Sequence, residues 1–176
     1  MNQVHLLPVG NVDDRILGVL GAALRDSLRI PCKVAEGALD PKPSYHAERQ
    51  QYHSSEILQR MQGLAPNDGV HLLGITAVDL YIPILQYVFG EAQLGGQLAI
   101  VSFHRLRQEF YGLDRDDALL AQRLTKEAVH ELGHTLGLRH CQDYRCAMAS
   151  AHAVEWIDLR DGALCDACQR RVDLNR

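Results

Sequence analysis

The amino-acid sequence predicts a mixed α/β fold, of the α+β kind. Apolar runs rich in Val, Leu and Ile have the length of strands at residues 3–9, 70–76 and 97–103. Other segments carry apolar residues every three to four positions, which is the spacing of a helix face. The 176 residues suffice for one domain with its own core, and they contain no repeat, low-complexity tract or long linker. We therefore expect residues 1–176 to form a single domain.

The first third of the chain predicts alternating strands and helices. After the strand at 3–9, Asp13 or Asp14 can cap a helix that runs to about Leu28, because the apolar residues between them recur at helical spacing. The other elements expected here are a short strand near 32–34, a loop over 35–43, and a second helix over 44–64 whose first half is polar.

The middle of the chain predicts two buried strands. Residues 66–69, Pro-Asn-Asp-Gly, predict a turn that leads into the strand at 70–76. A proline interrupts residues 79–87, so this stretch predicts no clear element. Residues 90–96 are rich in glycine and are expected to form a loop before the strand at 97–103.

A long, partly buried helix is predicted next. Aspartates at its start favour the positive end of the helix dipole; they are Asp114, Asp116 and Asp117. Its apolar residues recur every four positions, at Leu120, Leu124, Ala128, Leu132 and Leu136. Gly137 suits the left-handed position that ends a helix. Residues 138–176 are expected to be compact and irregular, with a short helix after Cys165.

Composition and charge exclude several classes of protein. The formal net charge is −4, from 18 basic and 22 acidic residues, and the basic residues are scattered. We therefore expect no nucleic-acid partner. No apolar stretch reaches the roughly 18 residues that a membrane-spanning helix needs. Residues 1–10 lack the basic start of a signal peptide, so we expect a cytoplasmic protein.

The decisive motif is His130-Glu131-Leu132-Gly133-His134, followed by Gly137 and His140. Residues four apart lie on one face of a helix, so His130 and His134 can present their imidazoles to one ion. Gly137 lets the chain turn sharply, and His140 can then supply a third nitrogen. Three protein ligands with an open fourth position are typical of a catalytic zinc site.

Glu131 lies one residue after the first histidine and is offset around the helix. It can face a water on the zinc without binding the zinc itself. Zinc lowers the pKa of such a water to about 7, and a carboxylate can take up the proton as the water attacks. Glu131 is therefore the predicted general base. The other histidines show no ligand spacing, and we expect surface or core roles for His5, His46, His53, His71, His104 and His152.

Four of the five cysteines gather near the C-terminus, as Cys141, Cys146, Cys165 and Cys168. They form two pairs in the sequence, Cys141 with Cys146 and Cys165 with Cys168. Two such pairs match a tetrahedral four-thiolate zinc site, which leaves no open position and is structural. The alternatives are two disulfides or an isolated redox C-x-x-C pair. The odd number of cysteines and the lack of an export signal favour zinc. Cys32 is expected to be a small buried residue, and the adjacency of His140 and Cys141 is expected to couple the two metal sites.

The histidine motif, the four cysteines and Met148 together resemble the archaemetzincins. The resemblance extends upstream to Leu73-Gly74-Ile75-Thr76, Asp79-Leu80-Tyr81, Phe89-Gly90 and Gly95-Gly96, and so covers most of the chain. It implies a compact metzincin-like domain with a mixed, twisted sheet and an active-site helix. Met148 then corresponds to the methionine of the Met-turn beneath the metal.

The resemblance also implies two subdomains. The upper one, 1–137, holds the sheet and the active-site helix. The lower one, 138–176, holds the third histidine, the Met-turn and the zinc-bound cysteines. Residues 98–102 are the expected edge strand that binds an extended peptide. Some metzincins carry a tyrosine two residues after the Met-turn methionine, where this chain has Ser150. The resemblance therefore assigns no residue to stabilise the oxyanion, and nothing in the sequence favours Tyr144 or Tyr111 for this role.

These features predict a zinc-dependent peptidase. We expect two Zn²⁺ ions per chain, one catalytic and one structural, a peptide or protein substrate, and a monomer. A zinc-stabilised binding or regulatory domain with little peptidase activity is the alternative, and the intact Glu131 weighs against it. A second alternative is amide hydrolysis on a small molecule. It would be favoured by a cleft without an extended edge strand.

Overall fold

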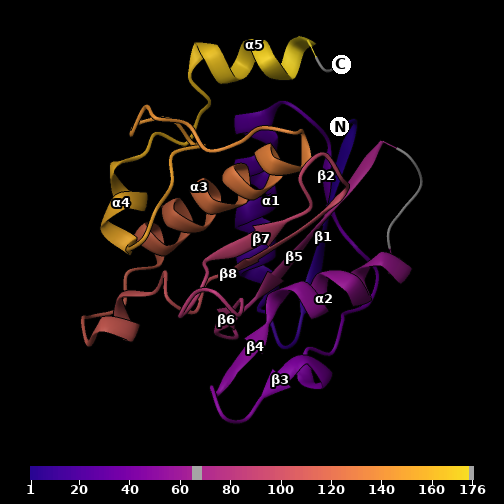
Figure 1. Cartoon of the computed structure of the whole chain (residues 1–176), viewed down its shortest axis with the longest axis vertical. Coiled ribbons are helices and arrows are strands. Elements are labelled where there is room, and N and C mark those ends of the chain that lie inside the picture. The colour runs from indigo at the N-terminus through magenta and orange to yellow at the C-terminus, as the bar shows by residue number, and fades with distance from the viewer. Residues whose placement is uncertain (65–68, 175–176) are drawn as a thin grey trace.

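The fold is built on a five-stranded sheet in the order β2-β1-β5-β8-β7 (Figure 1). A computed structural model describes residues 1–64 and 69–174. The strands are β1 (Gln3–Val9), β2 (Cys32–Val34), β5 (Val70–Thr76), β7 (Gly90–Ala92) and β8 (Leu98–Ser102). The first four in the order are parallel, and β7 is antiparallel to β8. The mixed α/β fold expected from the sequence is therefore confirmed.

Helices cover both faces of this sheet. On one face, α1 (Asp14–Leu28) and α3 (Asp117–Thr135) pack against each other and against the strands. On the other face lies the short α2 (Ser54–Met61). Side chains alternate between the faces along each strand. Leu6 accordingly packs in the core with α1, and Leu7 packs in the core with α2.

Helix boundaries agree with the local signals in the sequence. The side chain of Asp13 accepts a hydrogen bond of 2.8 Å from the backbone N–H of Arg15, and Asp116 accepts one of 2.8 Å from Leu119. Both aspartates are N-caps. Gly137 lies in the left-handed region at φ +83°, as its place after the long helix predicts. The turn expected at 66–69 lies largely outside the described residues.

The helix predicted over 44–64 is wrong in its first half. Residues 44–53 instead contain β3 (Tyr45–His46) and β4 (Gln51–His53), and the α-helix itself starts only at Ser54. β4 pairs in parallel with β6 (Leu80–Tyr81), which forms a second, three-stranded sheet. Short 3-10 turns flank these elements at Lys42–Ser44 and Gln62–Leu64, and another lies at Gln108–Tyr111.

The loop predicted at 90–96 is also partly wrong, because its first three residues form β7. This corrects the expected edge of the sheet. Residues 98–102, as β8, lie between β5 and β7 and are an interior strand. The edge next to the long helix is β7, which pairs with β8 in antiparallel register, Gly90 opposite Val101 and Ala92 opposite Ala99.

The C-terminal segment is more regular than expected. It contains α4 (Val154–Leu159) and α5 (Asp166–Leu174), of which only the second was predicted. Figure 1 shows α5 at one end of the molecule and β3 at the other. A separate small core joins Leu138, Cys146, Met148, Cys168 and Val172. Among the described residues, no helix combines the length and apolar character needed to cross a bilayer.

Candidate active site

Three histidines converge at the C-terminal end of α3. His130 and His134 lie one turn apart on the helix. Gly137 then turns the chain, and its N–H donates to the carbonyl of His134 at 2.9 Å. The turn brings His140 back, so that the ring centroids of the three imidazoles lie 4.6, 5.3 and 5.0 Å apart. One nitrogen from each ring lies within 4.8 Å of the others.

Backbone carbonyls fix the orientation of two of these rings. Nδ1 of His130 lies 2.8 Å from the carbonyl oxygen of Ala147, and Nδ1 of His134 lies 2.8 Å from that of Leu138. A carbonyl oxygen only accepts, so each Nδ1 carries the proton and each Nε2 presents a lone pair. The two Nε2 atoms face each other at 3.1 Å. Two lone pairs at this distance repel unless a cation lies between them.

Burial favours the neutral form of these histidines. It lowers the pKa of His130 well below the usual value, and the nearby Arg160 and His134 lower it further. Burial is also the main cause that lowers the pKa of His134 and of His140. Neutral imidazole is the form that binds a metal.

Glu131 is buried beside the histidines, under the edge strand. A Cβ placed on Gly90 would lie 2.7 Å from Oε1 of Glu131 and 2.6 Å from the carbonyl oxygen of Ile100. The absence of a side chain at Gly90 is thus what gives this carboxylate its place. Burial raises the pKa of Glu131 well above the ordinary value, and Glu127 raises it further, while Arg160 acts in the opposite direction. A raised pKa suits a general base at neutral pH.

A buried ion pair lies one helical turn before Glu131. Arg160 donates to Oε1 of Glu127 at 2.5 Å, and the two side chains are 1% and 3% exposed. Burial raises the pKa of Glu127, and the guanidinium of Arg160 opposes this rise. This pair could not be predicted from local sequence signals, because its members are 33 positions apart.

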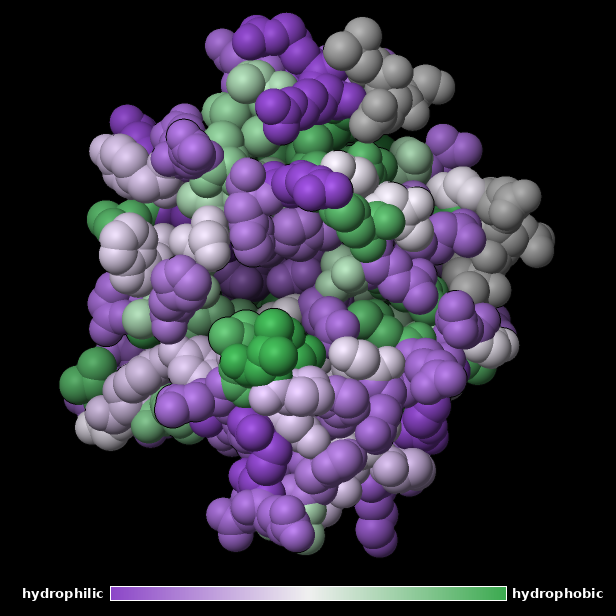
Figure 2. All heavy atoms as spheres, in the orientation of Figure 1, coloured by the Kyte–Doolittle hydropathy of each residue, from purple (hydrophilic) through white to green (hydrophobic). Residues whose placement is uncertain are grey.

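These groups line a cleft of about 950 Å³. Figure 2 shows that this face of the molecule is hollowed near its centre, with a hydrophobic patch beside the hollow. Sequence reasoning missed several polar residues that line the cleft: Glu91, Glu127, Arg139, His152 and Arg160. Ser150 also lines it, whereas neither Tyr111 nor Tyr144 is among the described residues that do so.

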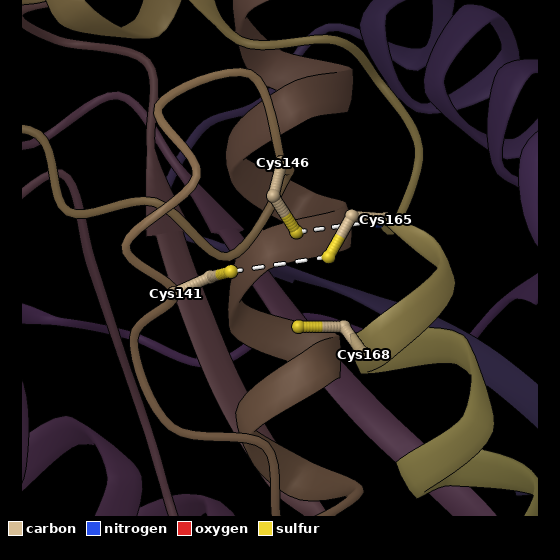
Figure 3. Close-up of side chains that lie close together, drawn as sticks. All are labelled: Cys141, Cys146, Cys165 and Cys168. Atoms are coloured by element: carbon tan, nitrogen blue, oxygen red, sulfur yellow. Dashed lines mark hydrogen bonds between the residues drawn. The ribbon is translucent and has the colours of Figure 1, made fainter.

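The four C-terminal cysteines form a second cluster, with their sulfurs pointing toward a common centre (Figure 3). The Sγ atoms of Cys141 and Cys165 are 3.9 Å apart, and all five cysteines of the chain are free. This spacing is far longer than a disulfide and matches the edge of about 3.8 Å of a tetrahedron with Zn–S bonds of about 2.3 Å. Burial raises the pKa of the Cys146 thiol, and the backbone N–H groups of Met148 and Cys165, which donate to its Sγ, partly oppose this rise.

Met148 connects the two clusters. Its side chain is fully buried against Gly133, where an added Cβ would collide with the sulfur of Met148. Its backbone carbonyl accepts a hydrogen bond of 2.8 Å from the N–H of Cys141, the residue after His140. The methionine therefore packs against the helix that carries His130 and His134, and its main chain holds the segment that carries His140.

Comparison with known proteins gives this geometry a family. Residues 33–174 match Peptidase family M54. The archaemetzincin of Methanocaldococcus jannaschii is 37% identical over 97% of this chain and 92% of its own length. The archaemetzincin of Haloquadratum walsbyi is 33% identical over 95% of this chain and 97% of its own length.

Solved structures agree with the sequence relatives. A zinc-dependent peptidase from Methanocorpusculum labreanum superposes with a TM-score of 0.85 and 28% identity, covering 96% of this chain and 99% of that one. The archaemetzincin from Archaeoglobus fulgidus, solved with malonate, superposes with a TM-score of 0.83 and 33% identity over the same shares. The chain therefore belongs to peptidase family M54, the archaemetzincins, and is a zinc-dependent metallopeptidase.

Proposed function

We propose that His130, His134 and His140 hold the catalytic zinc and that Glu131 is the general base of peptide hydrolysis. The observation that carries this proposal is the convergence of three neutral imidazoles on one point of the cleft, beside a buried carboxylate. Family membership favours this activity over a zinc-stabilised binding domain.

The donor set fits zinc. The Nε2 atoms of His130 and His134 are 3.1 Å apart, close to the edge of about 3.3 Å of a tetrahedron whose Zn–N bonds are about 2.05 Å. Each ring is held from behind by a carbonyl, the arrangement that orients histidine ligands in metal sites. Three protein ligands would leave a fourth position on a tetrahedral zinc for water or substrate.

When bound, zinc supplies a Lewis acid that polarises a carbonyl oxygen and lowers the pKa of a water to about 7. Glu131 then accepts one proton from the water while the water oxygen attacks the carbonyl carbon. The same carboxyl delivers that proton to the leaving nitrogen as the C–N bond breaks. Burial raises the pKa of Glu131, which favours uptake of the proton by its carboxylate.

We further propose that a peptide substrate binds in extended form along β7. This strand ends the sheet on the side of α3, and Gly90, Glu91 and Ala92 all line the cleft. Main-chain groups at a sheet edge can pair with an added strand. Glu91 is held by hydrogen bonds from Ser54 and Ser55 at 2.5 and 2.7 Å, which anchors the edge strand to α2.

The four cysteines are proposed to hold a second, structural zinc, for a total of two per chain. This ion would link the segment after His140 to α5 and would complete a lower subdomain, 138–176, below an upper one, 1–137. Free thiols in the cluster favour a reducing compartment such as the cytoplasm. One chain supplies all the residues of both sites, so a monomer suffices, and its size in solution can be measured by light scattering.

The test is the variant Glu131→Gln, assayed against a peptide library after loading with zinc. It should lose peptide hydrolysis and keep the zinc content of the wild-type protein, because the amide cannot accept the proton. Glu36→Gln, an exposed site far along the sequence from the motif, is the matched control and should keep full activity. Full turnover by Glu131→Gln would refute its role as the base.

A further inference from the structure

A third group of metal-binding side chains lies outside the two zinc clusters. It contains His46 in β3, His53 at the end of β4 and Glu56 in the first turn of α2. One ligand atom from each of the three lies within 4.8 Å of the others. Figure 1 shows β3 at the end of the molecule opposite α5, so this group is separate from the cysteine cluster. None of its three residues lines the catalytic cleft.

The spacing of the ligand atoms suits a small cation. Oε1 of Glu56 is 3.3 Å from Nε2 of His46 and 3.1 Å from Nδ1 of His53. These are the edges, of about 3.3 Å, of a tetrahedron with Zn–N and Zn–O bonds of about 2.05 Å. The two nitrogens that face each other in the catalytic site are 3.1 Å apart, so these two Glu56 distances are similar to that one.

The ring of His53 packs against Tyr81, with centroids 5.2 Å apart, but this contact leaves its two nitrogens without a hydrogen bond in the described part of the chain. Its side chain is 18% exposed, and among the described residues neither ring nitrogen makes a hydrogen bond, although Nδ1 lies close to Glu56. Leaving both polar atoms of a mostly buried imidazole unpaired is costly. His53 is also the N-cap residue of α2, but its side chain makes no capping hydrogen bond. A bound ion would satisfy one of these nitrogens.

An ion pair between Glu56 and protonated histidines is the simpler explanation of these contacts. It does not explain the arrangement of the three side chains. Both rings approach the same oxygen, Oε1, although a carboxylate has two. Burial alone would raise the pKa of Glu56, and the two histidines outweigh burial and lower it, so the carboxylate is ionised. The side chains of His46 and Glu56 are 44% and 39% exposed, which leaves a side open for water and for an arriving ion.

We propose that His46, His53 and Glu56 form a third metal site, which takes a divalent transition-metal ion such as Zn²⁺. Two imidazoles with one carboxylate favour zinc and its neighbours over calcium or magnesium, which require oxygen ligands. The ion would staple the β3–β4 hairpin to the start of α2. Ser54 and Ser55, which follow His53 directly, hold Glu91 of the edge strand, so the staple would also steady one wall of the cleft.

The experiment measures the total zinc bound per chain, which is the zinc present at the start, from elemental analysis, plus the zinc taken up in a calorimetric titration. Three proteins are compared: wild type, Glu56→Gln, and Glu48→Gln as the matched control. Glu48 is exposed in the same connection between β3 and β4 and is not a member of the group. Glu56 is itself partly exposed, so its variant should fold, and circular dichroism checks this.

The wild type and Glu48→Gln should each bind about one zinc ion more than Glu56→Gln, since the site needs all three ligands. Zinc should also raise the Tm of the wild type more than that of Glu56→Gln, and Ca²⁺ should produce no matching heat. Equal zinc binding by wild type and Glu56→Gln would overturn the proposal, as would displacement of the extra zinc by Ca²⁺. The comparison is a difference between variants, so it does not depend on how full the two other sites are.

Discussion

Arg160 and Glu127 form an ion pair that is almost completely excluded from water. Glu127 lies on α3, one helical turn before the predicted general base Glu131. Taking two charges out of water is expensive, and only their mutual attraction offsets this cost. Both residues also line the cleft. The pair therefore bears on stability and on the electrostatic environment of Glu131 at once.

Arg160→Met should destabilise the protein by about 3–5 kcal/mol, because it leaves a buried carboxylate without its partner. Urea unfolding followed by circular dichroism measures this. The control is the double variant Arg160→Met/Glu127→Met, which removes both charges and should recover most of the loss. If the free energy of unfolding of the single variant lies within about 0.5 kcal/mol of the wild-type value, the ion pair is not important for stability.

Gly90→Ala should reduce peptidase activity more than it reduces stability. The new methyl group would lie 2.7 Å from Oε1 of Glu131 and 2.6 Å from the carbonyl oxygen of Ile100, so the base must move. Displacements of this kind at a catalytic group cost on the order of a hundredfold in rate. Gly18→Ala in α1 is the control, since a Cβ there meets no atom within 4 Å. Equal activity of the two variants would argue against the tight fit around Glu131.

Cys168→Ser should remove the structural zinc and make the catalytic zinc easier to extract. Cys141 directly follows His140, and the N–H of Cys141 is held by the carbonyl of Met148, so the cysteine cluster helps to place the third histidine. Zinc release during mild chelation measures the effect. Cys32→Ser, a buried cysteine outside the cluster, should keep both ions. Identical release from the two variants would show that the sites are not coupled.

Acid should destabilise the metal-free protein partly through His71. Burial, helped by the N-terminal ammonium group, lowers the pKa of this histidine to about 4. Its Nδ1 lies 2.7 Å from Oγ1 of Thr135, whose hydroxyl in turn donates to the carbonyl of Leu132. The unfolded chain takes up a proton near pH 6.5 and the folded chain does so only near pH 4. Stability from this group is therefore constant above pH 6.5 and is lost as the pH falls toward 4.

The slope for one such proton is at most about 1.4 kcal/mol per pH unit. His71→Asn keeps a donor near the place of Nδ1 and does not titrate, so its unfolding free energy should fall less steeply between pH 6.5 and 4. Urea unfolding across this range, with chelator present in every sample, makes the comparison. Parallel curves for the two proteins would mean that His71 titrates normally in the folded state.

The parts of the fold that sequence predicted well are those with a local cause. α3 could be predicted from its apolar residues at every fourth position, from its N-cap Asp116 and from Gly137 after its end. The histidine motif lies within this helix, so the geometry of His130 and His134 follows from helical spacing alone. β1 and β5 are apolar runs long enough to identify without knowing their partners.

The parts that sequence missed depend on contacts between distant segments. β3, β4 and β6 have only two or three residues each, and they are strands because they pair with one another. β7 contains a glycine and has no apolar run, so only its pairing with β8 identifies it as a strand. Glu91, Arg160 and His152 reach the cleft through the tertiary fold. His46 and His53 were assigned no ligand role because only the turn between their strands brings them together with Glu56.

The most direct test of the central claim is the zinc content of the wild type and of His134→Gln, purified in parallel without chelator or histidine tag and measured by elemental analysis. The variant should contain about one zinc ion fewer per chain than the wild type, because the imidazole site needs all three of its ligands and the four thiolates hold their ion independently. Equal zinc content in the two proteins would contradict the assignment of the catalytic metal to His130, His134 and His140.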